Sequence, residues 1–277
     1  MVNHASSILP EIPCNTVNLA VHWWWGFPSS LDIRLLCRMR SSEGDWNSSG
    51  RWREYILPSI AGGDLLLADY LWDKVHGGRD DIVKYLRSFA EERNWNAEIF
   101  GSLAQDILHI PVEQKYRNKS LSPPQDLYRF WAHGALNWSP EYGTETSAAL
   151  LAVLGRMGEI QHRLWRGQTE LLLPVIDSTR LILCTHLTRK YGANWPTRWR
   201  LPLDQEEIEA VQNNPLSSQL GHLKSLLKYH IPKERRWVPL IDLLHSMRNR
   251  LAHYYPVTYP EFDDLCREIE QNLQRRF

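Results

Sequence analysis

One short segment near the C-terminal end of the chain holds side chains that could act on a phosphodiester. Arg248 and Asn249 are followed closely by His253. The arginine has a planar, permanently charged guanidinium that binds phosphate, and the imidazole titrates near neutral pH, so it can exchange a proton with a ribose hydroxyl. In RNA the 2′-hydroxyl is an internal nucleophile. The segment therefore predicts RNA as substrate and cleavage without a metal or any other cofactor.

The element that must position these side chains is a helix over about residues 239–253. Its apolar side chains share one face of the helical wheel, which must pack into a core: Leu240, Leu243, Leu244, Met247 and Leu251. His245, Asn249 and His253 fall roughly on the opposite face. Pro256 disfavours helical backbone at the residue before it. We therefore expect His253 in the last turn, where the chain leaves the helix.

A regular helix does not bring Arg248 and His253 together, because they lie about 140° apart in projection. The two side chains could meet through the long reach of the arginine, through a distorted last turn, or through a second copy of the chain. A two-fold dimer places identical helices side by side. A homodimer through the C-terminal domain satisfies this requirement well.

The segment at residues 248–253 (RNRLAH) resembles the Arg-x4-6-His motif of HEPN domains, including the polar residue directly after the arginine. These domains are antiparallel helical bundles with two long helices, a shorter pair and a late motif, and residues 147–277 resemble that layout. The resemblance implies a dimeric cleft and metal-independent endoribonuclease activity that leaves a 2′,3′-cyclic phosphate. It also implies that Arg248 and His253 are the catalytic pair, supported by Asn249. Many HEPN proteins act in bacterial antiphage or toxin–antitoxin systems, which implies a similar role here.

Two alternatives remain open at the level of sequence. Many HEPN domains lack activity and serve as dimerisation or partner-binding modules, here in a bacterial defence assembly. The chain could also be a helical scaffold without nucleotide contact. In both cases Arg248 and His253 would only solvate the end of a helix, where the helix dipole favours a cation.

Other polar side chains could complete the site. Glu170 and Asp177, on the second long helix expected in the bundle, and His245 are candidates for supporting roles. For Glu170 and Asp177, an ion pair or a helix cap is the simpler explanation. Three basic residues close to the site helix or on it are candidates to contact RNA phosphates: Arg235, Arg236 and Arg250.

The apolar spacing is helical almost throughout, which predicts an all-α fold. The polar stretch at residues 137–146 indicates a linker. It would separate a Trp-rich N-terminal helical accessory domain, residues 1–140, from a C-terminal HEPN-like antiparallel helical bundle, residues 147–277. The N-terminal domain carries no catalytic motif, and we expect it to sense, to restrain or to bind a protein partner.

Two helices are expected at the start of the bundle, over residues 147–165 and 168–190. Gly167, between them, would mark either a break or a close helix contact. The polar loop at residues 193–203 follows, and prolines near the starts of the last two helices suit the first helical position.

Composition narrows the functional classes. The 32 basic and 32 acidic residues balance, which argues against non-specific coating of nucleic acid. The four widely spaced cysteines indicate buried thiols in a reducing compartment, with neither a disulfide framework nor a zinc site. Signal-peptide features are missing, and no apolar stretch looks long enough to span a bilayer. We therefore expect a cytoplasmic protein without a membrane partner.

Tryptophan is abundant, with 13 residues, three of them consecutive at residues 23–25. These rings could fill helix cores or stack on bases, as in single-strand binders. The first interpretation is favoured, because few basic residues interleave with the run. Motifs of metalloproteases, P-loop NTPases, dinucleotide enzymes and serine hydrolases are missing from the sequence.

Overall fold

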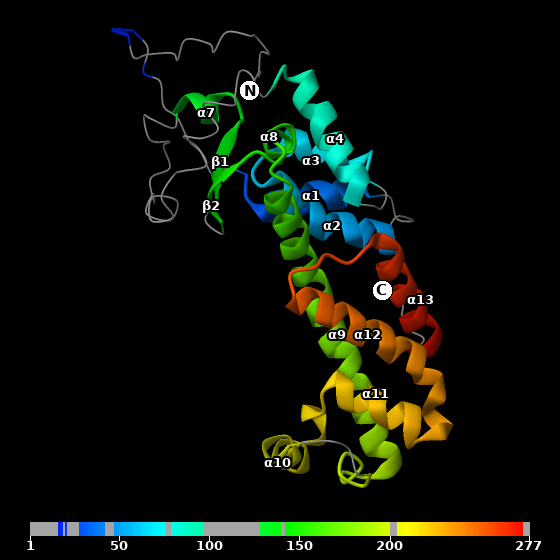
Figure 1. Cartoon of the computed structure of the whole chain (residues 1–277). Coiled ribbons are helices and arrows are strands. Elements are labelled where there is room, and N and C mark those ends of the chain that lie inside the picture. Colours follow the sequence, from blue (N-terminus) through cyan, green and yellow to red (C-terminus); the bar gives the residue numbers. More distant parts are fainter. Residues whose placement is uncertain are drawn as a thin grey trace. The chain divides into compact units, whose positions relative to one another are not determined.

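The computed structural model describes residues 16–18, 20, 28–41, 47–75, 79–96, 128–139, 142–199 and 204–273. Over these residues the predicted all-α fold is confirmed, with one small two-stranded sheet among the helices (Figure 1). The chain forms two compact units, Met1–Gly167 and Gln168–Phe277, and each is described by itself. The tryptophan run at residues 23–25 lies outside the described residues.

Short helices build most of the first unit. They are α1 (Ser30–Arg40), α2 (Ser48–Ala61), α3 (Leu65–Trp72), α4 (Arg79–Glu92), α7 (Tyr128–Ala132) and α8 (Ala148–Val153). Side-chain oxygens of Ser29, Asn47 and Asp64 accept backbone N–H groups at the starts of α1, α2 and α3. These bonds satisfy donors that have no partner inside the helix. Capping residues therefore set where these helices begin.

A β-hairpin takes the place of the linker predicted at residues 137–146. β1 (Leu136–Ser139) pairs antiparallel with β2 (Gly143–Thr146). The polar side chains of Ser139, Thr144 and Thr146 are buried. The linker prediction is wrong because it rested on polarity, and here polar side chains lie inside the unit. The two compact units divide farther along the chain, after Gly167.

One long helix, α9 (Met157–Tyr191, 35 residues), replaces the two helices predicted to meet at Gly167. The break lies earlier, at Gly155, which has a φ of +70° that glycine adopts easily. Gly167 stays helical and marks a close contact, because a Cβ atom there would lie 2.6 Å from the carbonyl oxygen of Tyr55. Of the two interpretations of Gly167, the close contact is confirmed and the break is wrong.

Among the described residues, α9 is the one helix that is long and apolar enough to cross a membrane by length and composition. Its most apolar 18-residue window has a mean hydropathy of 1.3, and 39% of that window is buried within the protein. The prediction that no stretch reaches this length is therefore wrong. Core helices of other proteins meet the same criteria, and Leu172, Leu183 and Cys184 of α9 are fully buried by the protein itself. Length and hydropathy alone thus do not assign α9 to a membrane.

The second unit combines the C-terminal part of α9 with the remaining helices (Figure 1). These are α10 (Gln205–Asn213), η1 (Pro215–Ser217), α11 (Leu220–Tyr229), η2 (Pro232–Trp237), α12 (Val238–Ala252) and α13 (Tyr259–Leu273). The predicted starts of α12 near Pro239 and of α13 near Pro260 are confirmed. α12 packs against α11 and α13. The predicted site helix thus lies in the middle of this unit.

A buried carboxylate fastens η2 to the end of α9. Glu234 is 1% exposed and accepts hydrogen bonds from Tyr191 Oη and Trp237 Nε1, each at 3.1 Å. It also pairs with Lys190 and lies 3.3 Å from His186 Nε2. Burial raises the pKa of the Glu234 carboxyl, but the hydrogen bonds from Lys190, Trp237 and Tyr191 outweigh burial, and the pKa is lowered overall. This cluster joins residues more than forty positions apart in the chain.

Candidate functional site

The two faces of α12 differ as the sequence predicts. Its buried side chains are Leu240, Ile241, Leu244, Met247 and Leu251. Leu243 is only half-buried, and Ile241 is buried in its place. On the polar face, Arg248 is exposed, whereas His245 and Asn249 are half-buried. The helix ends at Ala252, so His253 is its C-cap, and the predicted position of His253 at the helix end is confirmed.

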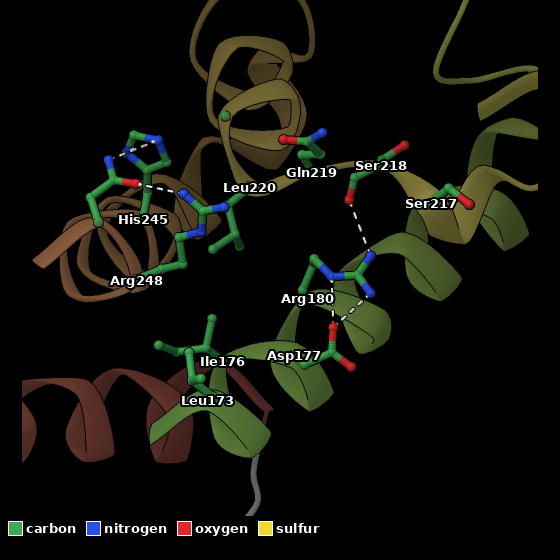
Figure 2. Close-up of a pocket in the computed structure, with 12 residues that line it drawn as sticks. Leu173, Ile176, Asp177, Arg180, Ser217, Ser218, Gln219, Leu220, His245 and Arg248 are labelled. Carbon is green, nitrogen blue, oxygen red and sulfur yellow. Dashed lines mark hydrogen bonds and ion pairs between the residues drawn. The ribbon is translucent and has the colours of Figure 1, made fainter. Parts of the chain in front are cut away.

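A pocket of about 480 Å³ opens beside the polar face of α12 (Figure 2). α12 contributes His245, Arg248 and Asn249 to its lining. The opposite wall comes from α9, and the segment that leads into α11 closes a third side. This volume falls within the range of pockets that bind small molecules or parts of larger ones. The predicted residues of α12 therefore face a space that a ligand could enter.

A chain of polar contacts connects the three α12 side chains. Arg248 Nη1 donates to Asn249 Oδ1 at 3.3 Å, and Asn249 Nδ2 lies 3.4 Å from His245 Nε2 (Figure 2). Because the amide oxygen of Asn249 accepts from Arg248, the amide N–H group faces the histidine. His245 Nε2 is then the acceptor, and the ring proton resides on Nδ1. Asn249 thus orients the guanidinium and the imidazole together.

The surroundings of His245 favour a neutral ring. Burial lowers the pKa of the imidazole, and the positive charges of Lys224 and Arg248 lower it further, whereas Asp242 acts in the opposite direction. Lys224 Nζ lies 2.7 Å from Asp242 Oδ1, so part of its charge is balanced. A neutral imidazole with an unprotonated Nε2 can accept a proton from a substrate hydroxyl.

The two arginines of the pocket differ in their partners. Arg180 is held by Asp177, with 2.7 Å between Nη2 and Oδ1, and donates to the backbone carbonyls of Leu216 and Ser218. Arg248, by contrast, contacts no carboxylate in the part of the chain that the structure describes. Arg180 therefore holds α9 to the segment before α11, and Arg248 is the cation that remains available to an anionic ligand.

Apolar side chains cover part of the pocket wall. Leu173 and Ile176 of α9 and Leu220 of α11 line it, and Leu173 is 41% exposed. Gly221 leaves room next to the imidazole, because a Cβ atom there would lie 3.8 Å from His245 Nε2. The pocket thus pairs a cation with an apolar wall, which suits a ligand that has both an anionic and an apolar part.

Among the residues that the sequence singled out, His245, Arg248, Asn249 and Asp177 line one pocket. His253 does not line it. Its side chain is exposed, and within the described ranges it makes no hydrogen bond or ion pair. One copy of the chain therefore does not place both motif residues in this pocket.

The other candidates lie elsewhere. Arg250 donates to both carboxylate oxygens of Glu261, at 2.5 and 2.7 Å, and to the Pro256 carbonyl, so its guanidinium fastens the loop after α12. Glu170 is exposed on α9, and Arg235 and Arg236 are exposed on η2. These four residues do not line the pocket.

Several lining residues were not foreseen from the sequence. Arg180, Ser217, Ser218, Gln219, Leu220 and Gly221 reach the pocket only because α9 and α11 pack beside α12. No local pattern relates these positions to residues 248–253. In the described part of the chain, no group of three or more His, Cys, Asp or Glu side chains could hold a metal ion.

Comparisons with models of protein families, with curated proteins and with solved structures find no match for this chain. The geometry of the pocket and the resemblance of residues 248–253 to the HEPN motif are therefore the basis for assigning a function.

Proposed function

We propose that this protein is a metal-independent endoribonuclease of HEPN type that acts as a homodimer. The observation that carries the proposal is Arg248, a cation without a carboxylate partner among the described residues, in a pocket that it shares with Asn249 and His245. A guanidinium that stabilises charge, an imidazole that transfers a proton and an amide that orients them can together support cleavage of RNA through its own 2′-hydroxyl.

In this mechanism Arg248 binds the scissile phosphate and stabilises the negative charge that grows on its oxygens. A histidine takes the proton of the 2′-hydroxyl while its oxygen attacks phosphorus. The bond from phosphorus to the 5′-oxygen breaks, and the leaving oxygen receives a proton. The products are a 2′,3′-cyclic phosphate and a 5′-hydroxyl, and no cofactor is consumed.

The exposed position of His253 supports a dimer. It lies at the end of α12 and outside the pocket of its own chain. A two-fold interface through the second unit could bring His253 of one copy to the pocket of the other. In that arrangement Arg248 and His253 act in trans.

The first test is incubation of the purified protein with tRNA, with and without EDTA. We expect cleavage to persist in EDTA and to fall about 1,000-fold in Arg248→Ala, because a charge-stabilising group is lost. Asn249→Ala should weaken cleavage less. Arg267→Ala is a matched control, since this exposed arginine pairs with Asp263 and Asp264 on α13. Equal activity of wild type and Arg248→Ala would refute the site.

The dimer has its own test, in which two inactive variants are mixed. Arg248→Ala and His253→Ala, combined in equal amounts and allowed to exchange subunits, should regain about a quarter of wild-type activity if the residues act in trans. Half of the dimers would then be mixed, and each mixed dimer would hold one intact site. No recovery after proven subunit exchange would show that the residues do not act in trans.

A second candidate function is a non-catalytic HEPN-like module that binds a protein partner. It is favoured by two observations: His253 lies outside the pocket, and Arg250 is engaged with Glu261. Such a module would form the dimer but leave tRNA intact. The incubation with tRNA therefore separates the two candidates.

A further inference from the structure

His245 is the histidine that lines the pocket together with Arg248. The two side chains come from the same face of α12, one turn apart, and Asn249 contacts both of them. Figure 2 shows His245 and Arg248 together on the α12 wall of the pocket, across from Asp177 and Arg180 of α9. The imidazole that shares the pocket with the available guanidinium is thus His245, although His253 is the histidine of the sequence motif.

We infer that His245 is the base that takes the proton of the attacking 2′-hydroxyl, and that Asn249 is the residue that positions it. This inference rests on the proposed endoribonuclease function and specifies the base within that site. His253, from the partner copy, is then the group that protonates the leaving oxygen.

The step balances in atoms and charge. His245 Nε2 accepts the hydroxyl proton as the 2′-oxygen forms its bond to phosphorus. The bond to the 5′-oxygen breaks, and that oxygen takes a proton from a protonated His253. Afterwards His245 returns its proton to solvent, and His253 regains one. The base must therefore start neutral and the acid must start protonated.

The contacts of His245 suit a base. Its Nε2 accepts from Asn249 at the long distance of 3.4 Å, so a substrate hydroxyl can replace this donor at little cost. Gly221 carries no side chain that would cover the same nitrogen, and a Cβ atom there would reach ordinary contact with it, at 3.8 Å. The Nε2 lone pair is therefore accessible to a substrate hydroxyl, because its present hydrogen bond with Asn249 is weak.

Charged groups surround the ring on each neighbouring element. They are Lys224 from α11, Asp242 and Arg248 from α12, and the Asp177–Arg180 pair from the α9 wall of the pocket. Burial and the two nearby cations lower the pKa of His245, and Asp242 opposes them. Activity that depends on neutral His245 should thus fall as the pH drops through this lowered pKa.

The test is the pH dependence of cleavage of a single-stranded RNA oligonucleotide from pH 4.5 to 9. His245→Gln keeps an acceptor for Asn249 but cannot take a proton. We expect its rate near neutral pH to fall about 100-fold, with loss of the decline at acidic pH. His253→Gln should also cleave slowly, yet it should keep the acidic decline, because His245 is intact in this variant.

His222→Gln is the matched control. His222 lies on α11, 3.4 Å from Glu207 and outside the pocket. This variant should cleave at the wild-type rate with the wild-type pH profile. Circular dichroism of all variants verifies the fold.

Asn249→Asp tests the positioning role without removing the histidine. A carboxylate at this place still accepts from Arg248 and, unlike the amide, favours a proton on His245 Nε2. The acidic decline should therefore move to higher pH, which requires that the side chain at position 249 face the catalytic imidazole in the active enzyme.

The outcomes separate the two proposals. If wild type cleaves RNA and His245→Gln keeps both the rate and the acidic decline, His245 is not the base, whereas the endoribonuclease function stands. An unshifted decline in Asn249→Asp would overturn the positioning role alone. If wild type does not cleave RNA, the proposed function fails, and the role of His245 fails with it.

Discussion

Two regions of the molecule use arginine in opposite ways. In the first unit, Arg163 is buried and donates to the Thr146 carbonyl at 2.6 Å, and the neighbouring Arg166 pairs with Glu145 at 3.0 Å. In the pocket of the second unit, Arg248 is exposed, and among the described residues its guanidinium donates only to the Asn249 side chain. Partners and burial, and not residue type, therefore distinguish an arginine that holds the fold from one that can bind a ligand.

Burial of the Arg163 guanidinium carries an electrostatic cost. Burial lowers the pKa of Arg163, and the negative charge of Glu145 acts against that shift. The guanidinium nonetheless stays charged, as arginine does in proteins. Its hydrogen bonds to the Thr146 and Ile60 carbonyls offset the lost hydration and fix β2 beside α2.

Replacing each arginine by methionine should give the largest difference in the free energy of unfolding. Arg163→Met should lower the free energy of unfolding by about 3 to 5 kcal/mol, because it leaves buried partners without a donor. Arg248→Met should change it by less than about 0.5 kcal/mol, since the side chain is exposed. Urea denaturation of both variants measures the difference. Equal losses of stability in the two variants would show that burial does not distinguish the two arginines.

The buried carboxylate of Glu234 allows the same comparison of buried and exposed charges for acidic residues. Glu234→Gln should cost roughly 2 kcal/mol at neutral pH, because bonds to a charged group are weakened. The folded-state pKa of Glu234 is lowered, so its contribution is present above the unfolded value of about 4.3 and is lost as the pH falls through the folded pKa.

Thermal unfolding from pH 3 to 7 checks this dependence. Wild type should lose more stability than Glu234→Gln toward acidic pH. Asp177→Asn, at an exposed carboxylate that pairs with Arg180, is the matched variant and should cost less stability at neutral pH than Glu234→Gln. Parallel curves for wild type and Glu234→Gln would contradict the assigned role of Glu234.

The smallest change in stability is expected at Gly221, which lines the pocket on α11. Gly221→Ala should stabilise α11 by about 0.5 kcal/mol, because alanine favours helix more than glycine does. The added methyl group would lie 3.8 Å from His245 Nε2, an ordinary contact distance. Chemical denaturation measures the gain, and a loss of stability would mean that the space beside His245 is tighter than the structure indicates.

Local signals account for the parts of the fold that sequence predicts well. Asp64 and Asp204 cap helices, and Pro239 and Pro260 begin them, because each effect acts within one turn. The apolar spacing of α12 likewise fixes its buried face. This spacing also indicates that Asn249 and His245 share the polar face of α12.

The rest depends on contacts between distant segments. The hairpin escapes prediction because its strands have only four residues each and β2 is polar, and their burial depends on neighbours such as Arg163. Glycine permits both helix and turn, so sequence does not distinguish Gly155 from Gly167 as the break. The α9 and α11 walls of the pocket form only when these helices pack beside α12.

The side chain of Gln168 forms hydrogen bonds with the backbone of the loop after His253, as a neighbouring strand does in a sheet. The buried Gln168 donates from Nε2 to the Val257 carbonyl at 2.8 Å, and its Oε1 accepts from the Val257 N–H at 2.7 Å. Val257 belongs to no helix or strand, yet both of its backbone polar groups are paired out of reach of water. Its amide proton should therefore exchange with deuterium as slowly as one in a sheet, and Gln168→Ala should make that exchange fast.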